Sequence, residues 1–409
     1  MVLPRRHPRD FQPGMTTKKG RRFKIACYSI QALCSFGMSF YFYYLYFLMR
    51  HRFDFGDRRN LALAAVIGFV YVFSAWQGGR FAQRHGYFTT LKLGTGVMIV
   101  SLLAGSQLGS ATGIIAASLV LNAGMCSLWP TLEALVSEGE DAVGLPRAVG
   151  TYNVVWAGTN ALALFTGGTL IKQFGFQCLF YLPLVTSLGQ LTLTFWLEKH
   201  ARDLAEATGG VPAPVPPPDP NRPSPARAKA FLRMAWLANP FAYIAITTLS
   251  AMLPGIAAKF HLTLMFAGFA CSLWGFARLG TFFALWFWTG WHYRFRWLVT
   301  AFVLLILAFA TILIAPLLAL VLAAQIVFGV AIGLIYYSSL FYSMDASETK
   351  SEHGGIHEAA IGVGNCIGPA VGAASLQWLP QYANSGAVAV SVLLLFGLGG
   401  LVAIWKTAR

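Results

Sequence analysis

Residues 198–229 read EKHARDLAEATGGVPAPVPPPDPNRPSPARAK, the one long stretch of the chain that suits neither a hydrophobic core nor a bilayer. The stretch begins with charged residues, passes through Gly209 and Gly210, and continues through eight prolines. Because proline fixes φ and lacks a backbone N–H, the middle is predicted to be an extended, semi-rigid linker. Both flanks are long and apolar, which favours a linker between two membrane-embedded bundles over one between two soluble domains.

The composition supports this interpretation. The 409 residues are 56% hydrophobic and 11% charged, whereas a soluble chain carries about 25% charged residues. A helix that spans the hydrocarbon core needs roughly 20 apolar residues. Twelve such stretches are present, at about residues 24–49, 60–78, 88–108, 112–136, 146–172 and 176–197 before the linker, and 231–257, 262–289, 297–315, 317–343, 355–378 and 385–405 after it.

The predicted fold is therefore an all-α integral membrane protein with twelve transmembrane helices in two pseudo-symmetric six-helix bundles, at residues 24–197 and 230–405. A basic tail, residues 1–23, precedes the first bundle, and residues 406–409 follow the second. The first apolar stretch is too long for a signal peptide and lacks a cleavage site, so we expect it to be retained as a span. Met15 offers a second plausible start, and residues 1–14 are predicted to be unstructured.

The basic residues are unevenly distributed. The formal net charge is +15, but Lys and Arg concentrate in the N-terminal tail, in the linker and at alternate segment ends. The positive-inside rule then predicts that both termini and the linker are cytoplasmic, in a plasma or inner membrane. This arrangement argues against nucleic-acid binding and leaves membrane lipids as the surrounding partner.

The chain shows no pattern typical of a soluble catalytic or cofactor site. Its six cysteines are scattered singly along apolar segments, with neither a disulfide framework nor metal-ligand spacing. No phosphate-binding loop, zinc motif, nucleophile elbow or dinucleotide fingerprint is present. We therefore expect no cofactor, no metal and no direct coupling to ATP.

The two halves resemble one another. Three pairs of identical residues are each separated by 205 positions: Asn160 and Asn365, Gly167 and Gly372, Gly150 and Gly355. Small residues at helical spacing allow close helix packing, so the shared spacing indicates an internal duplication.

The turn at Gly79–Gly86 resembles the hallmark loop of the major facilitator superfamily, Gly-x-Leu-x-Asp-Arg-x-Gly-Arg-Arg. Gly79, Arg84 and Gly86 match in register, whereas Gln83 stands where the family has aspartate. The resemblance implies two six-helix bundles with a site between them. It also implies that this loop gates the closed state through a charge relay, from which Gln83 removes the acid.

An ionisable side chain within a membrane span is costly, so it marks a candidate functional position. Arg278 is the clearest case, about 24 Å into its segment at 1.5 Å per residue. One interpretation is a fixed positive charge in a central cavity, for an anionic substrate. The other is a buried ion pair, or a guanidinium capped by helix-end carbonyls.

Three further titratable residues are candidates for proton coupling. Glu133 lies near the end of its segment, and His357 and Glu358 open theirs. Each is interpreted either as a proton carrier or as a structural charge, Glu133 at the membrane interface and the other two at a helix start favoured by the dipole.

Polar and aromatic residues within the spans are candidate substrate-binding residues, or alternatively form hydrogen bonds between helices. They are Asn122, Asn153, Trp156, Asn160, Tyr336, Tyr337 and Asn365. A row of tyrosines at 41, 43, 44 and 46 fits either an aromatic belt at the membrane interface or a cavity wall.

These features together predict a monomeric secondary transporter that moves a small, anionic or polar-aromatic solute by alternating access. The energy is expected to come from a proton gradient or, alternatively, from the solute's own gradient. Two alternatives remain. One is a transport-inactive sensor or assembly partner with the same fold, and the other is a lipid-modifying membrane enzyme, which would need clustered catalytic groups at one membrane depth.

Overall fold

The computed structural model describes residues 18–137, 144–208, 224–346 and 350–408. The described residues form helices joined by short connections, with no β-strand among them. Twelve segments are long and apolar enough to cross a membrane. The prediction of an all-α chain with twelve spans is therefore confirmed.

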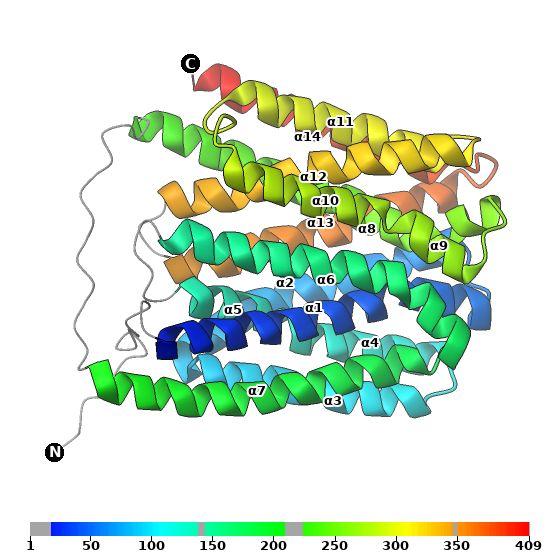
Figure 1. Ribbon diagram of the computed structural model, residues 1–409. Coiled ribbons are helices and arrows are strands. Elements are labelled where there is room, and N and C mark those ends of the chain that lie inside the picture. Colours follow the sequence, from blue (N-terminus) through cyan, green and yellow to red (C-terminus); the bar gives the residue numbers. More distant parts are fainter. Residues whose placement is uncertain (1–17, 138–143, 209–223, 347–349, 409) are drawn as a thin grey trace.

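The helices form two groups that lie side by side in Figure 1, the first coloured blue to green and the second green to red. The first comprises α1 (Lys18–Phe53), α2 (Asp57–His85), α3 (Tyr87–Gln107), α4 (Ala111–Cys126), α5 (Leu128–Ser137), α6 (Gly144–Phe174) and α7 (Cys178–Thr208). The second comprises α8 (Pro225–Lys259), α9 (Leu264–Cys271), α10 (Leu273–Phe287), α11 (Phe295–Ile314), α12 (Leu318–Ala346), α13 (Lys350–Trp378) and α14 (Ser385–Thr407).

The stretch predicted as a linker is partly helical. Helix α7 continues to Thr208 and α8 begins at Pro225, where proline at the first helical position needs no hydrogen-bonded N–H. Residues 209–223, for which an extended conformation is predicted, lie outside the described residues, as do residues 1–17 of the tail.

Two predicted spans are broken helices. The span at residues 111–137 divides at Ser127 into α4 and α5, and the span at 264–287 divides at Ser272 into α9 and α10. Pro130 explains the first break, because a proline lacks an N–H and is tolerated in the first turn of a new helix. Helix α8, in contrast, runs through Pro240 and Pro254 without a break.

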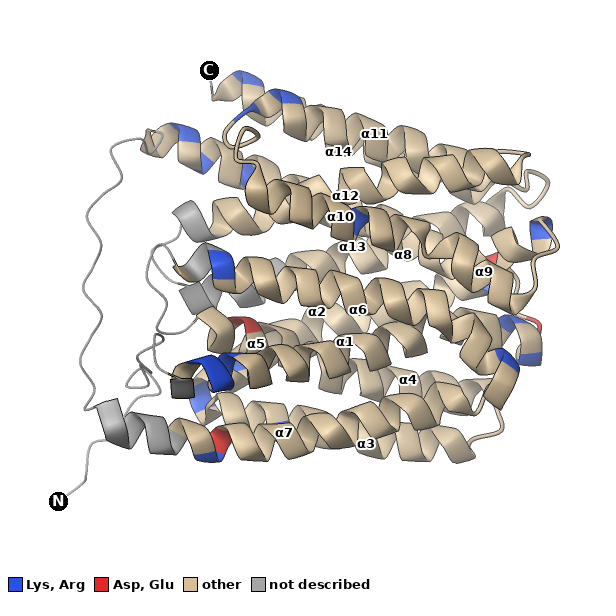
Figure 2. Cartoon of the chain, in the orientation of Figure 1, with Lys and Arg blue, Asp and Glu red and all other residues tan. Residues whose placement is uncertain are grey.

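Charged side chains gather near the two ends of the bundle (Figure 2). We call the end at which α1 begins and α14 ends the terminal end, and the opposite end the far end (left and right in Figure 1). At the terminal end, Lys92 and Glu198 form an ion pair of 3.0 Å, which joins α3 to α7. Lys24 Nζ donates to the Val136 carbonyl at 2.8 Å, which joins α1 to α5.

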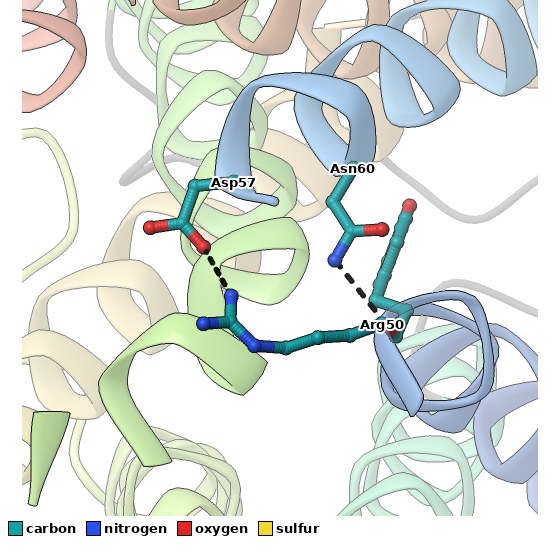
Figure 3. A network of polar contacts seen from close by, with 4 residues as sticks. Arg50, Asp57 and Asn60 are labelled. Atoms are coloured by element: carbon teal, nitrogen blue, oxygen red, sulfur yellow. Dashed lines mark hydrogen bonds and ion pairs between the residues drawn. The ribbon is translucent and has the colours of Figure 1, made fainter. Parts of the chain in front are cut away.

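A polar network closes the turn between α1 and α2 at the far end (Figure 3). Arg50 Nη1 donates to Asp57 Oδ1 at 3.1 Å, and Asn60 Nδ2 donates to the Tyr46 carbonyl at 3.3 Å. Asp57 lies in the first turn of α2, where a negative charge is favoured by the helix dipole. The network therefore holds the two helices in one hairpin.

The loop that resembles the family hallmark lies at the end of α2. Gly79 and Arg84 belong to the last turns of this helix, and Gly86 separates it from α3. The φ of Gly86 is +90°, a conformation that side chains other than glycine rarely adopt. The turn therefore requires this glycine, while the gating role of the loop stays a prediction.

The two groups of helices meet along α2 and α13, and along α6 with α9 and α10. At the second contact, a Cβ added to Gly168 would lie 2.2 Å from the Leu264 carbonyl oxygen and 3.0 Å from Met265 Cα. Both neighbouring atoms belong to the backbone of α9. Since backbone cannot move aside as a side chain does, α6 and α9 approach this closely only because residue 168 is glycine.

We expect Gly168→Val to open the contact between α6 and α9. Overpacking costs about 1–3 kcal/mol, which corresponds to about a 5- to 150-fold shift in a two-state population. The measurement is the labelling rate of a cysteine introduced by Leu264→Cys, with an impermeant maleimide. Gly96→Val is the matched control, because nothing lies within 4 Å of a Cβ at Gly96. Equal labelling rates in the two glycine variants would contradict the expectation.

Candidate functional site

A cavity of about 200 Å³ lies between the two groups of helices. Its walls come from both: α1, α2, α4, α5 and α6 on one side, and α8, α12 and α13 on the other. The lining includes aromatic rings, amides, hydroxyls and two carboxyl groups. This mixture of a largely apolar wall with a few polar groups is typical of a small-molecule binding site.

Arg278 lies directly behind one wall of this cavity. Its guanidinium donates from Nη2 to Asn160 Oδ1 at 2.7 Å, and the side chain is only 2% exposed. Its Cζ lies 4.3 Å from the ring centroid of Trp156 and 5.1 Å from that of Trp274. Asn160 and Trp156 line the cavity. Arg278 contacts both of these residues but is not itself part of the lining.

The positive charge of Arg278 is not neutralised by any carboxylate within ion-pair distance among the described residues. Its Nε atom is buried and has no hydrogen-bond partner. Of the two interpretations from sequence, the buried ion pair therefore finds no partner in the described part of the chain. The guanidinium is instead held by an amide and two indole rings.

Asn160 organises this wall. Its Oδ1 accepts from Arg278 and from the Tyr43 hydroxyl, the latter at 3.3 Å, and its Nδ2 donates to Ser39 Oγ at 2.7 Å. Asn365, its counterpart in the second half, accepts from the Thr247 hydroxyl of α8. Each asparagine thus bonds a hydroxyl on the first helix of its own half, and both line the cavity.

Stacked rings continue the wall beside Arg278. Trp156 stacks on Tyr336 with 5.0 Å between centroids, and Phe282 stacks on Tyr336 at 5.8 Å. Trp156 belongs to the first half, and the other two rings to the second. A planar group in the cavity would therefore meet aromatic surface from both halves.

Two carboxyl groups, Glu133 of α5 and Glu358 of α13, line the same cavity. Tyr71 of α2 donates its hydroxyl to Glu358 Oε2. Glu133 and Arg278 each follow the break in their own span by six residues. A change in the angle at either break would therefore move a charged or titratable group relative to the cavity.

The structure brings most of the predicted site residues together. Those that line the cavity are Asn122, Glu133, Trp156, Asn160, Tyr336, Glu358 and Asn365. Asn122 Nδ2 donates to the Ile67 carbonyl at 3.0 Å, so it also bonds α4 to α2. Asn153 is buried away from the cavity, and Tyr337 packs instead against Phe282 and Trp291. The side chain of His357 lies outside the described residues.

The row of tyrosines on α1 does not form an interfacial belt. All four are at most 9% exposed, and Tyr43 and Tyr46 line the cavity while Tyr41 and Tyr44 bond or pack inside the first half. A belt would expose these rings to lipid, so this interpretation is corrected in favour of the cavity wall. Residues 41, 43, 44 and 46 point to different faces of a helix, and only one face of a single helix can meet lipid. The spacing of the four tyrosines was therefore a signal in the sequence that they do not all face lipid.

Several lining residues have no distinguishing signal in the sequence. They are Gln31, Ser39, Tyr71, Tyr243 and Thr247. Gln31 is fully buried, and neither its Nε2 nor its Oε1 has a hydrogen-bond partner. Because a buried amide left unpaired costs free energy, a water or a bound solute is expected to satisfy Gln31.

The family assignment follows from the sequence as a whole. The family model described as Major Facilitator Superfamily matches residues 27–373, which is most of the chain. The chain belongs to the Major Facilitator Superfamily. No curated protein sequence is significantly similar to it.

Solved structures of other major facilitator proteins share the fold. The human organic anion transporter MFSD10 (TETRAN) is 15% identical with a TM-score of 0.67, over 94% of this chain and 100% of that chain. A structure described for proton dependent oligopeptide transporters is 16% identical with a TM-score of 0.67, over 95% and 100%. A bacterial homologue of the human lysosomal transporter Spinster, inward-facing and occupied, is 13% identical with a TM-score of 0.67, over 96% and 98%.

At these identities the similarity shows the fold, which this chain shares with the three transporters. The family prediction made from Gly79, Arg84 and Gly86 is thereby confirmed. A multi-pass membrane protein of this superfamily handles a small-molecule solute, which agrees with a cavity enclosed by both halves.

Proposed function

We propose that the protein is a proton-coupled secondary transporter that moves an organic anion by alternating access. The observation that carries the proposal is a buried arginine, without a carboxylate partner among the described residues, behind the wall of a cavity that two titratable carboxyl groups line. The arginine selects a negative substrate, and the carboxyl groups offer positions for a proton.

The substrate class follows from the chemistry of the wall. A carboxylate or sulfonate matches a guanidinium, and an aromatic ring matches the stacked surface of Trp156 and Tyr336. Asn365 and Gln31 supply amide groups for further hydrogen bonds. An aromatic acid of modest size therefore fits the site better than a sugar or a cation.

The proposed location is the plasma or inner membrane, with α1 beginning and α14 ending on the cytoplasmic side. The support is the concentration of Lys and Arg in the tail and the linker, as the positive-inside rule requires. We propose a monomer as the working unit, because one chain supplies both walls of the cavity.

The test is solute flux in proteoliposomes containing the purified protein. Three radiolabelled probes are compared: an aromatic sulfonate, a hexose and an aromatic cation. The sulfonate is chosen because it stays ionised at all working pH values and does not leak as a neutral acid. Saturable flux of the sulfonate, stimulated by a pH gradient, is expected; flux of the hexose or the cation alone would overturn the substrate class.

The same experiment separates the two alternatives. Absence of flux for all probes, with the protein correctly folded, would favour a transport-inactive sensor or assembly partner. Chemical conversion of a lipid would favour an enzyme.

A further inference from the structure

One hydrogen bond in the cavity joins the two halves directly through a titratable group. Tyr71 of α2, in the first half, donates its hydroxyl to Glu358 of α13, in the second half. Both side chains line the cavity and are buried, at 9% and 5% exposure. When α2 and α13 separate on this side of the cavity, this bond must break.

Glu358 has no cationic partner in the part of the chain that the structure describes. No Lys or Arg of the described residues lies within ion-pair distance of it. The titratable groups that face Glu358 from the surrounding helices are Tyr71 of α2, Cys126 of α4, Glu133 of α5, Tyr152 of α6, Tyr243 of α8 and Tyr336 of α12. The only acid among these six groups is a second carboxyl, that of Glu133.

The backbone of α13 holds Tyr71 in place. Gly362 lies one turn after Glu358, and a Cβ added there would lie 3.0 Å from Tyr71 Cδ1 and 2.9 Å from the Val72 nitrogen. The tyrosine ring therefore lies close to α13 at Gly362, and the reach of its hydroxyl to Glu358 depends on the close approach of the two helices.

We propose that Tyr71 is a positioning residue that links the protonation of Glu358 to the packing of α2 against α13. The proposal rests on the proposed proton coupling and names the residue through which the proton and the conformational change are connected. A hydrogen bond to a carboxylate is roughly twice as strong as one to a neutral acid, so closed helices favour the ionised Glu358. Separated helices leave a carboxylate without its donor, and this carboxylate then takes up a proton.

The link acts in both directions, because a coupling free energy between two events is reciprocal. Protonation of Glu358 weakens the hydrogen bond and thereby loosens the contact between the halves. Closure of the contact returns the donor and releases the proton. Tyr71 thus makes the conformational change depend on the proton, which is the requirement for coupled rather than independent movement.

The first test compares Tyr71→Phe with Tyr41→Phe. Tyr41 is the matched control, because its buried hydroxyl bonds Ser118 at 2.8 Å entirely within the first half. In proteoliposomes, Tyr71→Phe is expected to lose most of the accumulation of an aromatic sulfonate that a pH gradient drives, when this accumulation is compared with the same variant's exchange at equal pH on both sides. Tyr41→Phe is expected to behave as the wild type in both assays.

The second test does not depend on transport. The infrared band of the protonated Glu358 carboxyl is identified by its loss in Glu358→Gln and followed as pH rises. In Tyr71→Phe, which lacks the hydroxyl donor, the midpoint pH at which this Glu358 band disappears is expected to be about one to two pH units higher than in the wild type.

The outcomes distinguish this inference from the proposed function. A Glu358 band that titrates at the same pH in Tyr71→Phe and in the wild type, or that does not titrate, overturns the role of Tyr71. Wild-type accumulation in Tyr71→Phe overturns it as well, and leaves the proposed function standing. Failure of the wild type to move the sulfonate in either assay overturns the proposed function itself.

Discussion

The apparent affinity for the sulfonate in transport is expected to fall about 30-fold or more when Arg278 is replaced by alanine. Loss of a buried, hydrogen-bonded charge contact costs about 2–5 kcal/mol, and every 1.4 kcal/mol is tenfold. Asn160 and Trp156 would remain, but neither carries a charge that could attract the anion. The measurement is the concentration dependence of sulfonate exchange at equal pH, with membrane insertion checked separately.

Two further variants separate charge from packing. Arg278→Met keeps an apolar stem between Trp156 and Trp274 without the charge, and is expected to lose transport as Arg278→Ala does. Arg278→Lys keeps the charge and is expected to retain part of the affinity, because an ammonium cannot match an anion in the planar, bidentate manner of a guanidinium.

The control for general loss of an arginine is Arg296→Ala. Arg296 is exposed and lies 5.4 Å from the Trp297 ring, so it shares the aromatic contact of Arg278 but not the cavity. This variant is expected to transport normally. Wild-type affinity in Arg278→Ala would remove Arg278 from the site, and equal losses in Arg278→Ala and Arg296→Ala would indicate a nonspecific effect.

Accumulation of the sulfonate against its gradient is expected to disappear in Glu358→Gln. A transporter that couples one proton to each solute accumulates it about tenfold per pH unit of gradient, since one pH unit is about 1.36 kcal/mol. A glutamine keeps the shape and hydrogen-bonding capacity of the acid but cannot take up a proton. The ratio of internal to external sulfonate is therefore expected to fall to about one, while exchange at equal pH continues.

Glu133→Gln is expected to reduce the same accumulation. Glu133 lines the cavity, but among the described residues it has no bond to the opposite half such as Glu358 receives from Tyr71. The variant pair therefore shows whether one carboxyl or both carry the proton.

Glu198→Gln is the matched control for loss of a carboxyl group. Its carboxylate pairs with Lys92 at 3.0 Å at the terminal end, outside the cavity. Accumulation at the wild-type ratio is expected. If both cavity variants also accumulate normally, proton coupling through these residues is refuted.

The sequence predicted the fold well because the bilayer restricts the possible structures. In lipid every backbone group must be bonded within its segment, so each long apolar stretch becomes a helix. The number of spans could therefore be predicted from hydropathy alone. The breaks at Ser127 and Ser272 were not predicted. Pro130 follows the first break, but a proline within a span does not by itself end the helix, as Pro240 and Pro254 of α8 show, and the second broken span contains no proline.

The candidate site was predicted in part, for a similar reason. Arg278, Glu133 and Glu358 were identified because a charge within a span is costly and therefore conspicuous. Tyr71 and Gln31 were missed because both side chains are uncharged, and an uncharged polar residue within a span does not stand out in the sequence as a charged one does. Asn153 and Tyr337 are the same residue types within spans as Asn160 and Tyr336, but they do not line the cavity.

Hydropathy and charge, which each residue carries independently of its neighbours, determined from the sequence alone that this chain is a twelve-span membrane protein. The tertiary structure alone decided which polar groups meet. Arg278 and Asn160 are 118 positions apart in the chain, and Tyr71 and Glu358 are 287 apart. Such partners are chosen by how helices pack across two halves, and no local pattern in the sequence records that choice.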